Sequence, residues 1–362
     1  MTGGGVYPAL AVLQTMDIAK QDVLWIGSEN PMEADLLTSH EIQYQAIPAA
    51  GVHGVGITKL PGNVIQILKG YLRARIIIRD FKPNAVFYTG GFLAFPVSLA
   101  ARRIPSVAFI PDIEPGSALK YLVPHCDLIA ATTEATLFYL PRNKRVEITG
   151  YPVRSELMQW NKAKGKKELG LHDHKPIVLV FGGSKGARSI NQALEGVLSK
   201  LLENVQVIHI TGNENWDVCK NLKSSLPSSV RSDYHPFAFL GELMGAALAS
   251  ADLAVCRAGA STLGELPFFK LPAILVPYPH AWHYQYTNAE YLASHGGAII
   301  LKDQELQTNM YSTITSLLQD GARLEKMTES MQKLSHPDAA KRIGELIISA
   351  TKVKGGKQAW SV

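Results

Sequence analysis

The chain has 362 residues, of which 46% are hydrophobic and 19% charged, and its formal net charge is +5. This length suits two hydrophobic cores, and the composition is in the range of a soluble globular protein with large buried sheets. The mild positive charge is weak support for nucleic-acid binding, and no apolar run is long enough to cross a bilayer. Three scattered cysteines and the lack of a signal-peptide pattern predict a cytoplasmic protein with reduced thiols.

The predicted elements alternate between strands and helices. A glycine loop at residues 2–10 leads into a helix over residues 8–18, and another helix is predicted over residues 95–103. Apolar strands are predicted at residues 23–27, 84–89, 105–110, 128–132 and 145–149, and again at 177–181, 205–211, 253–256, 272–276 and 298–301. Such alternation predicts an α/β fold with two Rossmann-like, doubly wound parallel-sheet domains.

The first domain lacks its expected first strand. A Rossmann-like domain begins with a central strand that leads into a loop of this kind, but no strand precedes residues 2–10. We therefore expect a gap in the first sheet; either the natural chain begins several residues upstream, which we favour, or another segment of the chain fills the gap. A hinge is predicted from Gly150 to about Lys167, and a cleft between the domains is the expected site because ligands bind beyond the carboxyl ends of parallel strands.

The glycine loop at residues 182–186 is the most informative motif. It lies between a buried strand and a helix, so backbone N–H groups and a helix dipole can face an anion there. Gly183 permits close approach of a ligand, and Ser184 and Lys185 can add donors. The spacing matches neither the Walker A pattern nor G-x-G-x-x-G, which disfavours an ATPase and a Rossmann oxidoreductase. A nucleotide diphosphate is the expected ligand, and a purely structural turn is the alternative.

Two further loops follow predicted strands. Residues 257–265 form a loop-to-helix junction in which the Glu265 carboxylate can accept two ribose hydroxyls, although it can also simply cap the helix. Residues 276–289 are rich in aromatic and amide groups, which suits sugar recognition by Gln285 and Asn288. His280 and His283 have helical spacing but no further ligands nearby in the sequence, so no metal site is expected.

Charge supports two more assignments. Arg154, just after the hinge, can meet a diphosphate or form an exposed ion pair. Residues 59–82 are amphipathic and basic, which is compatible with an anionic membrane surface and equally with a core helix that has a solvated basic face.

Taken together, these blocks resemble one bacterial family. It comprises the UDP-N-acetylglucosamine:undecaprenyl-pyrophosphoryl-muramoyl-pentapeptide N-acetylglucosaminyltransferases, GT-B enzymes that make lipid II from lipid I in peptidoglycan synthesis. The resemblance rests on residues 2–10, 90–92, 150–154, 182–187, 258–265, 276–289 and 336–340. It implies a peripheral protein on the cytoplasmic face of the plasma membrane that acts in cell-wall biogenesis, cell shape and cell division, without a cofactor.

The resemblance also implies domains and site residues. Residues 1–153, joined by a C-terminal helix at 337–355, would form the acceptor and membrane-side domain, and residues 154–336 the donor domain. UDP-N-acetylglucosamine would be bound by Arg154, Gly183, Ser184, Lys185, Ala260, Ser261, Thr262, Leu263, Glu265, Gln285 and Asn288. The polyprenyl-diphosphate acceptor would be bound by Gly3, Gly4, Gly5, Gly90 and Gly91.

Four departures from the family pattern stand out. The family's T-G-G-H histidine, a proposed catalytic residue, is replaced by Gly5, and its H-E-Q-N segment is replaced by residues 109–112. Tyr284 occupies the position of the first of two adjacent glutamines in the family, and Lys185 occupies a position where the family usually has glutamine. An inverting transfer needs a general base, for which Asp112, then Glu114, then His53 are the candidates. Asp112 can instead merely cap a turn.

Three other functions remain open at this point. A related UDP-sugar-dependent glycolipid glycosyltransferase would differ in its acceptor, for example diacylglycerol. A UDP-N-acetylglucosamine 2-epimerase would share the two-domain fold without a lipid acceptor, which the basic amphipathic segment argues against. A non-catalytic nucleotide-sugar binder is motivated by Gly5 and the missing strand. No nucleic-acid partner is expected.

Overall fold

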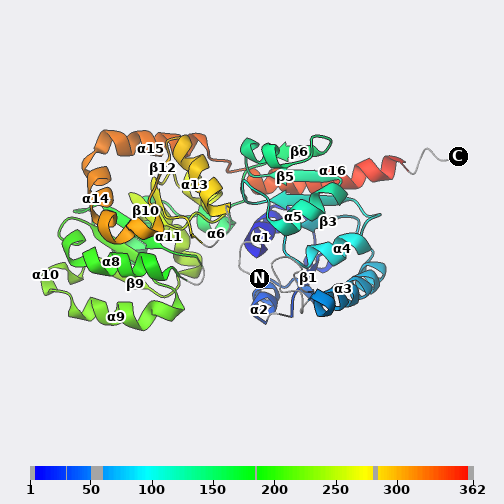
Figure 1. Ribbon diagram of the computed structural model, residues 1–362, viewed down its shortest axis with the longest axis horizontal. Coiled ribbons are helices and arrows are strands. Elements are labelled where there is room, and N and C mark those ends of the chain that lie inside the picture. Colours follow the sequence, from blue (N-terminus) through cyan, green and yellow to red (C-terminus); the bar gives the residue numbers. More distant parts are fainter. Residues whose placement is uncertain (1–4, 30, 50–59, 184–185, 280–283, 358–362) are drawn as a thin grey trace. The chain divides into compact units, whose positions relative to one another are not determined.

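The computed structural model describes residues 5–29, 31–49, 60–183, 186–279 and 284–357 (Figure 1). The chain divides into two compact units. The first unit is Met1–Pro152 with Asp338–Val362, and the second unit is Val153–Pro337. Each unit consists of parallel strands covered by helices, and each is described separately below.

The second unit contains a six-stranded parallel sheet with the strand order β12-β11-β10-β7-β8-β9. Its strands are β7 (Ile177–Phe181), β8 (Gln206–Ile210), β9 (Tyr234–Phe237), β10 (Leu253–Cys256), β11 (Ala273–Leu275) and β12 (Ala298–Ile300). All five residues of β7 are buried, because β7 lies in the middle of the sheet and is covered on both faces. The chain order reverses beside β7, as in doubly wound folds.

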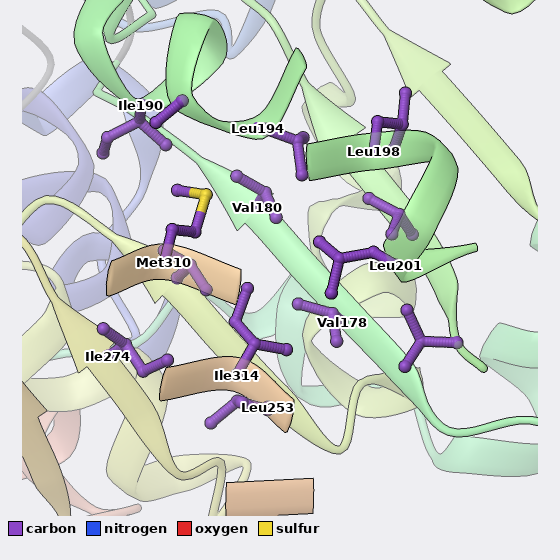
Figure 2. Close-up of a cluster of buried hydrophobic side chains, with 14 of the residues drawn as sticks. Val178, Val180, Ile190, Leu194, Leu198, Leu201, Leu253, Ile274, Met310 and Ile314 are labelled. Atoms are coloured by element: carbon purple, nitrogen blue, oxygen red, sulfur yellow. The ribbon is translucent and has the colours of Figure 1, made fainter. Parts of the chain in front are cut away.

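Ten α-helices of the second unit are described. They are α6 (Ser155–Met158), α7 (Lys162–Leu169), α8 (Arg188–Leu201), α9 (Trp216–Ser225), α10 (Ser228–Arg231), α11 (Met244–Ser250), α12 (Thr262–Phe268), α13 (Tyr284–Ser294), α14 (Leu306–Gln319) and α15 (Gly321–Lys333). Helices α8 and α14 pack together over one face of the sheet. Figure 2 shows Leu194 and Leu198 of α8 and Ile314 of α14 gathered around Val178 and Val180 of β7, where all five side chains are buried.

The first unit has two separate sheets within the described residues. Strand β1 (Leu24–Gly27) pairs with β2 (Gln43–Ala46), while β3 (Val86–Tyr88), β4 (Ser106–Ile110), β5 (Leu128–Ala131) and β6 (Arg145–Ile148) form a second parallel sheet. The described helices of this unit are α1 (Val6–Thr15), α2 (Pro31–Ser39), α3 (Leu60–Phe81), α4 (Ala94–Ala100), α5 (Ser117–Leu122) and α16 (Ala339–Lys357). Helix α16 packs against α1, β4 and β5, so the end of the chain returns to the first unit.

The expected fold class is confirmed, since both units are parallel-sheet α/β domains, and within the described residues the strands of the first unit form two separate sheets. Two strands were not predicted from the sequence. Strand β2 is short and polar, with the sequence Gln-Tyr-Gln-Ala, and β9 contains Pro236, which is tolerated because β9 lies at the edge of its sheet. Helix α1 ends at Thr15, three residues before the predicted end at residue 18. Among the described helices, none combines the length and hydropathy that a membrane crossing requires.

Candidate functional site

The predicted donor-site loops leave the same edge of one sheet. Phe181 at the end of β7 is in register with Cys256 at the end of β10, and Cys256 is in register with Leu275 at the end of β11. The glycine loop, the 257–262 segment and the segment after Val276 therefore start from adjacent strands at their carboxyl ends. This is where ligands bind in open α/β sheets.

The glycine loop is a tight turn on the second unit. The N–H of Gly186 donates to the carbonyl of Gly183 at 2.7 Å, and Gly186 has a φ of +79°, which favours glycine. A Cβ atom on Gly186 would lie 2.5 Å from the carbonyl oxygen of Thr211, and one on Gly182 would lie 2.4 Å from the backbone of Gly186. Gly183 is exposed, and a Cβ there would meet no atom within 4 Å. The loop is thus tightly packed against backbone atoms at Gly182 and Gly186, whereas Gly183 faces open space from which a ligand can approach.

A buried polar network supports this loop, and the sequence analysis did not identify it. The amide of Asn191, in the first turns of α8, donates to the carbonyl of Thr211 at 2.8 Å and contacts His209 Nε2 at 3.0 Å. His209 Nδ1 lies 2.8 Å from the Tyr234 hydroxyl. Burial lowers the pKa of His209 to about 3, so its ring is neutral at physiological pH. These hydrogen bonds connect α8 to the sheet and hold the Thr211 carbonyl, against which Gly186 packs.

The second junction brings Glu265 close to Arg154. The N–H and hydroxyl of Thr262 both donate to the carbonyl of Gly259, at 3.0 and 2.6 Å, which closes the turn that begins α12. Burial raises the pKa of the Glu265 carboxyl group, while the Arg154 charge and a hydrogen bond from Ser261 lower it. A carboxylate held between a cation and a hydroxyl, one turn into a helix, is suited to accept hydroxyl groups of a ligand.

The remaining residues of this junction have different exposures. Leu263 and Thr262 are buried, while Ala260 and Ser261 are partly exposed. Gly259 has open space beside it, since a Cβ there would meet nothing within 4 Å. The backbone at residues 259–261 is therefore accessible from the carboxyl edge of the sheet.

Gln285 and Asn288 are both in α13, but they occupy different environments. Gln285 is partly exposed, and its side-chain oxygen accepts the N–H of Tyr278 at 2.8 Å. Asn288 is fully buried and donates to the carbonyl of Ala258 at 3.1 Å. Gln285 is thus at the surface of the candidate site, whereas Asn288 supports the loop after β10 from beneath.

In the first unit, the candidate bases follow β4. The hydroxyl of Thr132 donates to the carbonyls of Ile110 and Pro111, at 2.9 and 3.0 Å, and so fixes the chain just before Asp112. Asp112 is partly exposed. Glu114 forms an ion pair with Lys120 at 2.7 Å, which reduces its availability as a base.

The glycines expected to bind the acceptor are described in part. Gly5 is the residue before α1, and Gly90 and Gly91, which follow β3, have φ angles of +102° and +85°. Positive φ angles at two successive residues explain why glycine occupies both positions. Gly3, Gly4, His53, Ser184, Lys185, His280 and His283 lie outside the described residues. Within the described part of the chain, no group of three or more His, Cys, Asp or Glu side chains could hold a metal ion.

Family models match most of the chain. The glycosyltransferase family 28 N-terminal domain matches residues 2–126, and the glycosyltransferase family 28 C-terminal domain matches residues 177–343. The chain is 35% identical to a UDP-N-acetylglucosamine–N-acetylmuramyl-(pentapeptide) pyrophosphoryl-undecaprenol N-acetylglucosamine transferase of Roseiflexus, covering 96% of this chain and 92% of the relative. It is 33% identical to the protein of the same name from Listeria monocytogenes, covering 97% and 98%.

Solved structures agree with this assignment. The crystal structure of Acinetobacter baumannii MurG is similar, with a TM-score of 0.74, 26% identity and 96% of each chain covered. A UDP-GlcNAc 2-epimerase from Neisseria meningitidis has a TM-score of 0.66 at 15% identity over 96% of this chain and 97% of that one, a likeness of fold alone. The chain therefore has the GT-B fold and is an enzyme of glycosyltransferase family 28, in the family of these N-acetylglucosamine transferases.

Proposed function

We propose that this protein transfers N-acetylglucosamine from UDP-N-acetylglucosamine to undecaprenyl-diphosphate-muramoyl-pentapeptide, which converts lipid I to lipid II. The observation that carries the proposal is the meeting of the glycine loop, the Glu265 junction and the Gln285 segment at the carboxyl ends of adjacent strands. The names of the relatives, which match over nearly the whole chain, supply the donor and acceptor.

The second unit holds the donor in this scheme. Backbone N–H groups around Gly183, with Ser184 and Lys185, would bind the diphosphate, and Arg154 would add a positive charge. The Glu265 carboxylate accepts ribose hydroxyls, and Gln285 contacts the sugar. Ala260, Ser261, Thr262 and Leu263 line the start of α12, and Asn288 acts indirectly by holding Ala258. Arg154 and the backbone amides stabilise the departing UDP, so the scheme assigns no step to a metal or cofactor.

The first unit holds the acceptor. The loops with Gly3, Gly4, Gly5, Gly90 and Gly91 would bind the lipid-linked diphosphate, since a glycine-rich backbone can approach phosphate groups closely. A base then removes a proton from the acceptor hydroxyl as that hydroxyl attacks the anomeric carbon. Asp112 is the preferred base because it follows a fixed strand end, whereas Lys120 holds Glu114 in an ion pair. His53 is the third candidate.

Helix α3 gives the proposed membrane contact, on the cytoplasmic face of the plasma membrane. Its inner side is buried at Gly70, Ala74 and Ile77. Its outer side carries an exposed apolar stripe at four-residue spacing, Val64, Leu68, Leu72 and Ile76, whose exposed fractions are 57, 56, 51 and 43%. Exposed basic residues of the same helix are Lys69, Arg73, Arg75 and Arg79. An apolar stripe flanked by cations suits an anionic lipid surface.

The decisive test is transfer of radiolabelled N-acetylglucosamine to two acceptors, a lipid I analogue and diacylglycerol. We expect label on the lipid I analogue alone. Label on diacylglycerol alone would assign the protein to glycolipid synthesis, and conversion of the donor sugar without any acceptor would indicate an epimerase.

A further inference from the structure

Arg257 connects three segments around the candidate donor site. It lies just after β10, is only 9% exposed and uses both terminal nitrogens of its guanidinium group. Nη1 donates to Asp303 Oδ1 at 2.5 Å and to the carbonyl of Val276 at 3.2 Å. Nη2 donates to the hydroxyl of Ser189 at 2.7 Å, and that hydroxyl donates to Asp303 at 2.8 Å.

This network leaves Arg257 unsuited to bind a phosphate directly. Its charge is paired with Asp303, and hydrogen bonds to Asp303, Val276 and Ser189 occupy three of its four terminal N–H groups. The fork geometry of a guanidinium group allows several segments to be held at once, which an ammonium group cannot reproduce. Arg257 therefore acts on the site through the residues that it holds.

Arg257 also contacts Tyr278, which lies next to the residue proposed to bind the sugar, Gln285. The Arg257 Cζ atom lies over the Tyr278 ring, 5.2 Å from the ring centre, and this cation–π contact restrains the ring shortly after β11. The N–H of Tyr278 donates to Gln285 Oε1 at 2.8 Å. A backbone N–H can only donate, so the Gln285 oxygen must face it, and the amide nitrogen must face the other way.

We propose that Arg257 is a positioning residue for recognition of the donor sugar, because it holds Tyr278 and Tyr278 in turn orients the Gln285 amide. The inference rests on the proposed function, in which Gln285 contacts the sugar. Ser189, another residue that Arg257 contacts, lies in the first turn of α8 after the glycine loop. Loss of the Ser189 hydroxyl should disturb the phosphate side of the site instead.

The test compares the dissociation constants of UDP and UDP-N-acetylglucosamine by calorimetry. Arg257→Lys keeps a cation beside Asp303 but loses the guanidinium fork and the guanidinium group above the Tyr278 ring. We expect it to weaken binding of UDP-N-acetylglucosamine about 10-fold or more, while UDP alone weakens by less than about 3-fold. In the Gln285→Ala background, Arg257→Lys should change the ratio of the two dissociation constants by less than about 2-fold.

Two further variants distinguish a specific loss of sugar affinity from a general effect of misfolding. Tyr278→Leu leaves the hydrogen bonds of Arg257 in place and should reproduce the selective loss of sugar affinity. Ser189→Ala is the matched control and should weaken both ligands by the same factor. The inference would be overturned, with the proposed function intact, if Arg257→Lys and Tyr278→Leu weakened binding of both ligands equally. It would also be overturned if the effects of Arg257→Lys and Gln285→Ala on the ratio of the two dissociation constants multiplied in the double variant. A folded wild-type protein that binds neither ligand would overturn the proposed function and the inference with it.

Discussion

Arg154 lies close to Glu265, and the two residues interact electrostatically. Burial is the larger effect and raises the pKa of the Glu265 carboxyl group above 4.5, while the Arg154 guanidinium charge acts in the opposite direction and lowers it. Arg154 precedes α6, and Glu265 is in α12, more than a hundred residues later. The interaction links the start of the second unit to the candidate ribose site. It also gives binding a dependence on pH that can be measured.

The affinity for UDP should increase with pH through the raised pKa of Glu265. The ionised carboxylate accepts two hydroxyls, whereas the protonated form accepts them less well, so binding weakens as the group is protonated at a pH above 4.5. Glu265→Gln should lower affinity at pH 7 by about 10- to 100-fold and abolish this part of the pH dependence. Calorimetric titrations with UDP at several pH values measure both. An unchanged pH profile in the variant would rule out Glu265 as the titrating group.

Substitution by alanine should destabilise the protein at one glycine of the loop and leave its stability nearly unchanged at another. Gly186→Ala places a Cβ 2.5 Å from the Thr211 carbonyl at a φ of +79°, so the free energy of unfolding should fall by about 1–3 kcal/mol. Gly183→Ala meets nothing within 4 Å and should change stability by less than about 0.5 kcal/mol.

The same pair tests the phosphate site. Gly183→Ala should weaken UDP binding about 10-fold, because the new methyl group stands where the ligand approaches. Denaturant unfolding and calorimetry together separate the two effects. A Gly183→Ala protein that binds UDP as tightly as wild type would mean that the ligand does not approach the loop there.

Asp112→Asn should lower the rate of transfer by about 100- to 10,000-fold, because an amide cannot accept the proton of the acceptor hydroxyl. Binding of UDP-N-acetylglucosamine should be unchanged, since the donor is assigned to the second unit. Glu114→Gln is the matched variant, and we expect a much smaller loss because Lys120 already holds this carboxylate. A fully active Asp112→Asn enzyme would exclude Asp112, and His53→Ala would then be the next variant to assay.

Leu68→Glu should reduce binding to vesicles that contain anionic phospholipid by about 10-fold, because it places a charge in the exposed stripe of α3. Val218→Glu is a control of similar exposure, 56%, on α9 of the second unit, and should have no effect. Co-sedimentation with vesicles measures both variants, and added salt should weaken the wild-type interaction. Equal binding by Leu68→Glu and wild type would remove α3 as the contact surface.

Much of the fold could be predicted because apolar strands alternate with helices along the chain. Strand β7, for example, is a run of five buried apolar residues that ends in a glycine turn. The strands that were missed lack this signal. Strand β2 is polar, and β9 contains a proline that only its edge position allows.

The candidate site could be predicted in part from its motifs. Glycines 182–186 and Glu265 stand at junctions that sequence order and residue type reveal. Sequence could not show that Arg257 spans to Ser189 and Asp303, because these residues meet only when the strand order brings β7, β10 and β12 to one edge. It also could not show that Asn288 is buried under Ala258 while Gln285, three residues earlier, remains partly exposed.

The most direct test of the central claim is a calorimetric titration of the folded wild-type protein with UDP-N-acetylglucosamine. We predict saturable binding of one nucleotide sugar per chain, with UDP competing for the same site. A well-folded protein that takes up neither UDP nor its sugar conjugates would contradict the account.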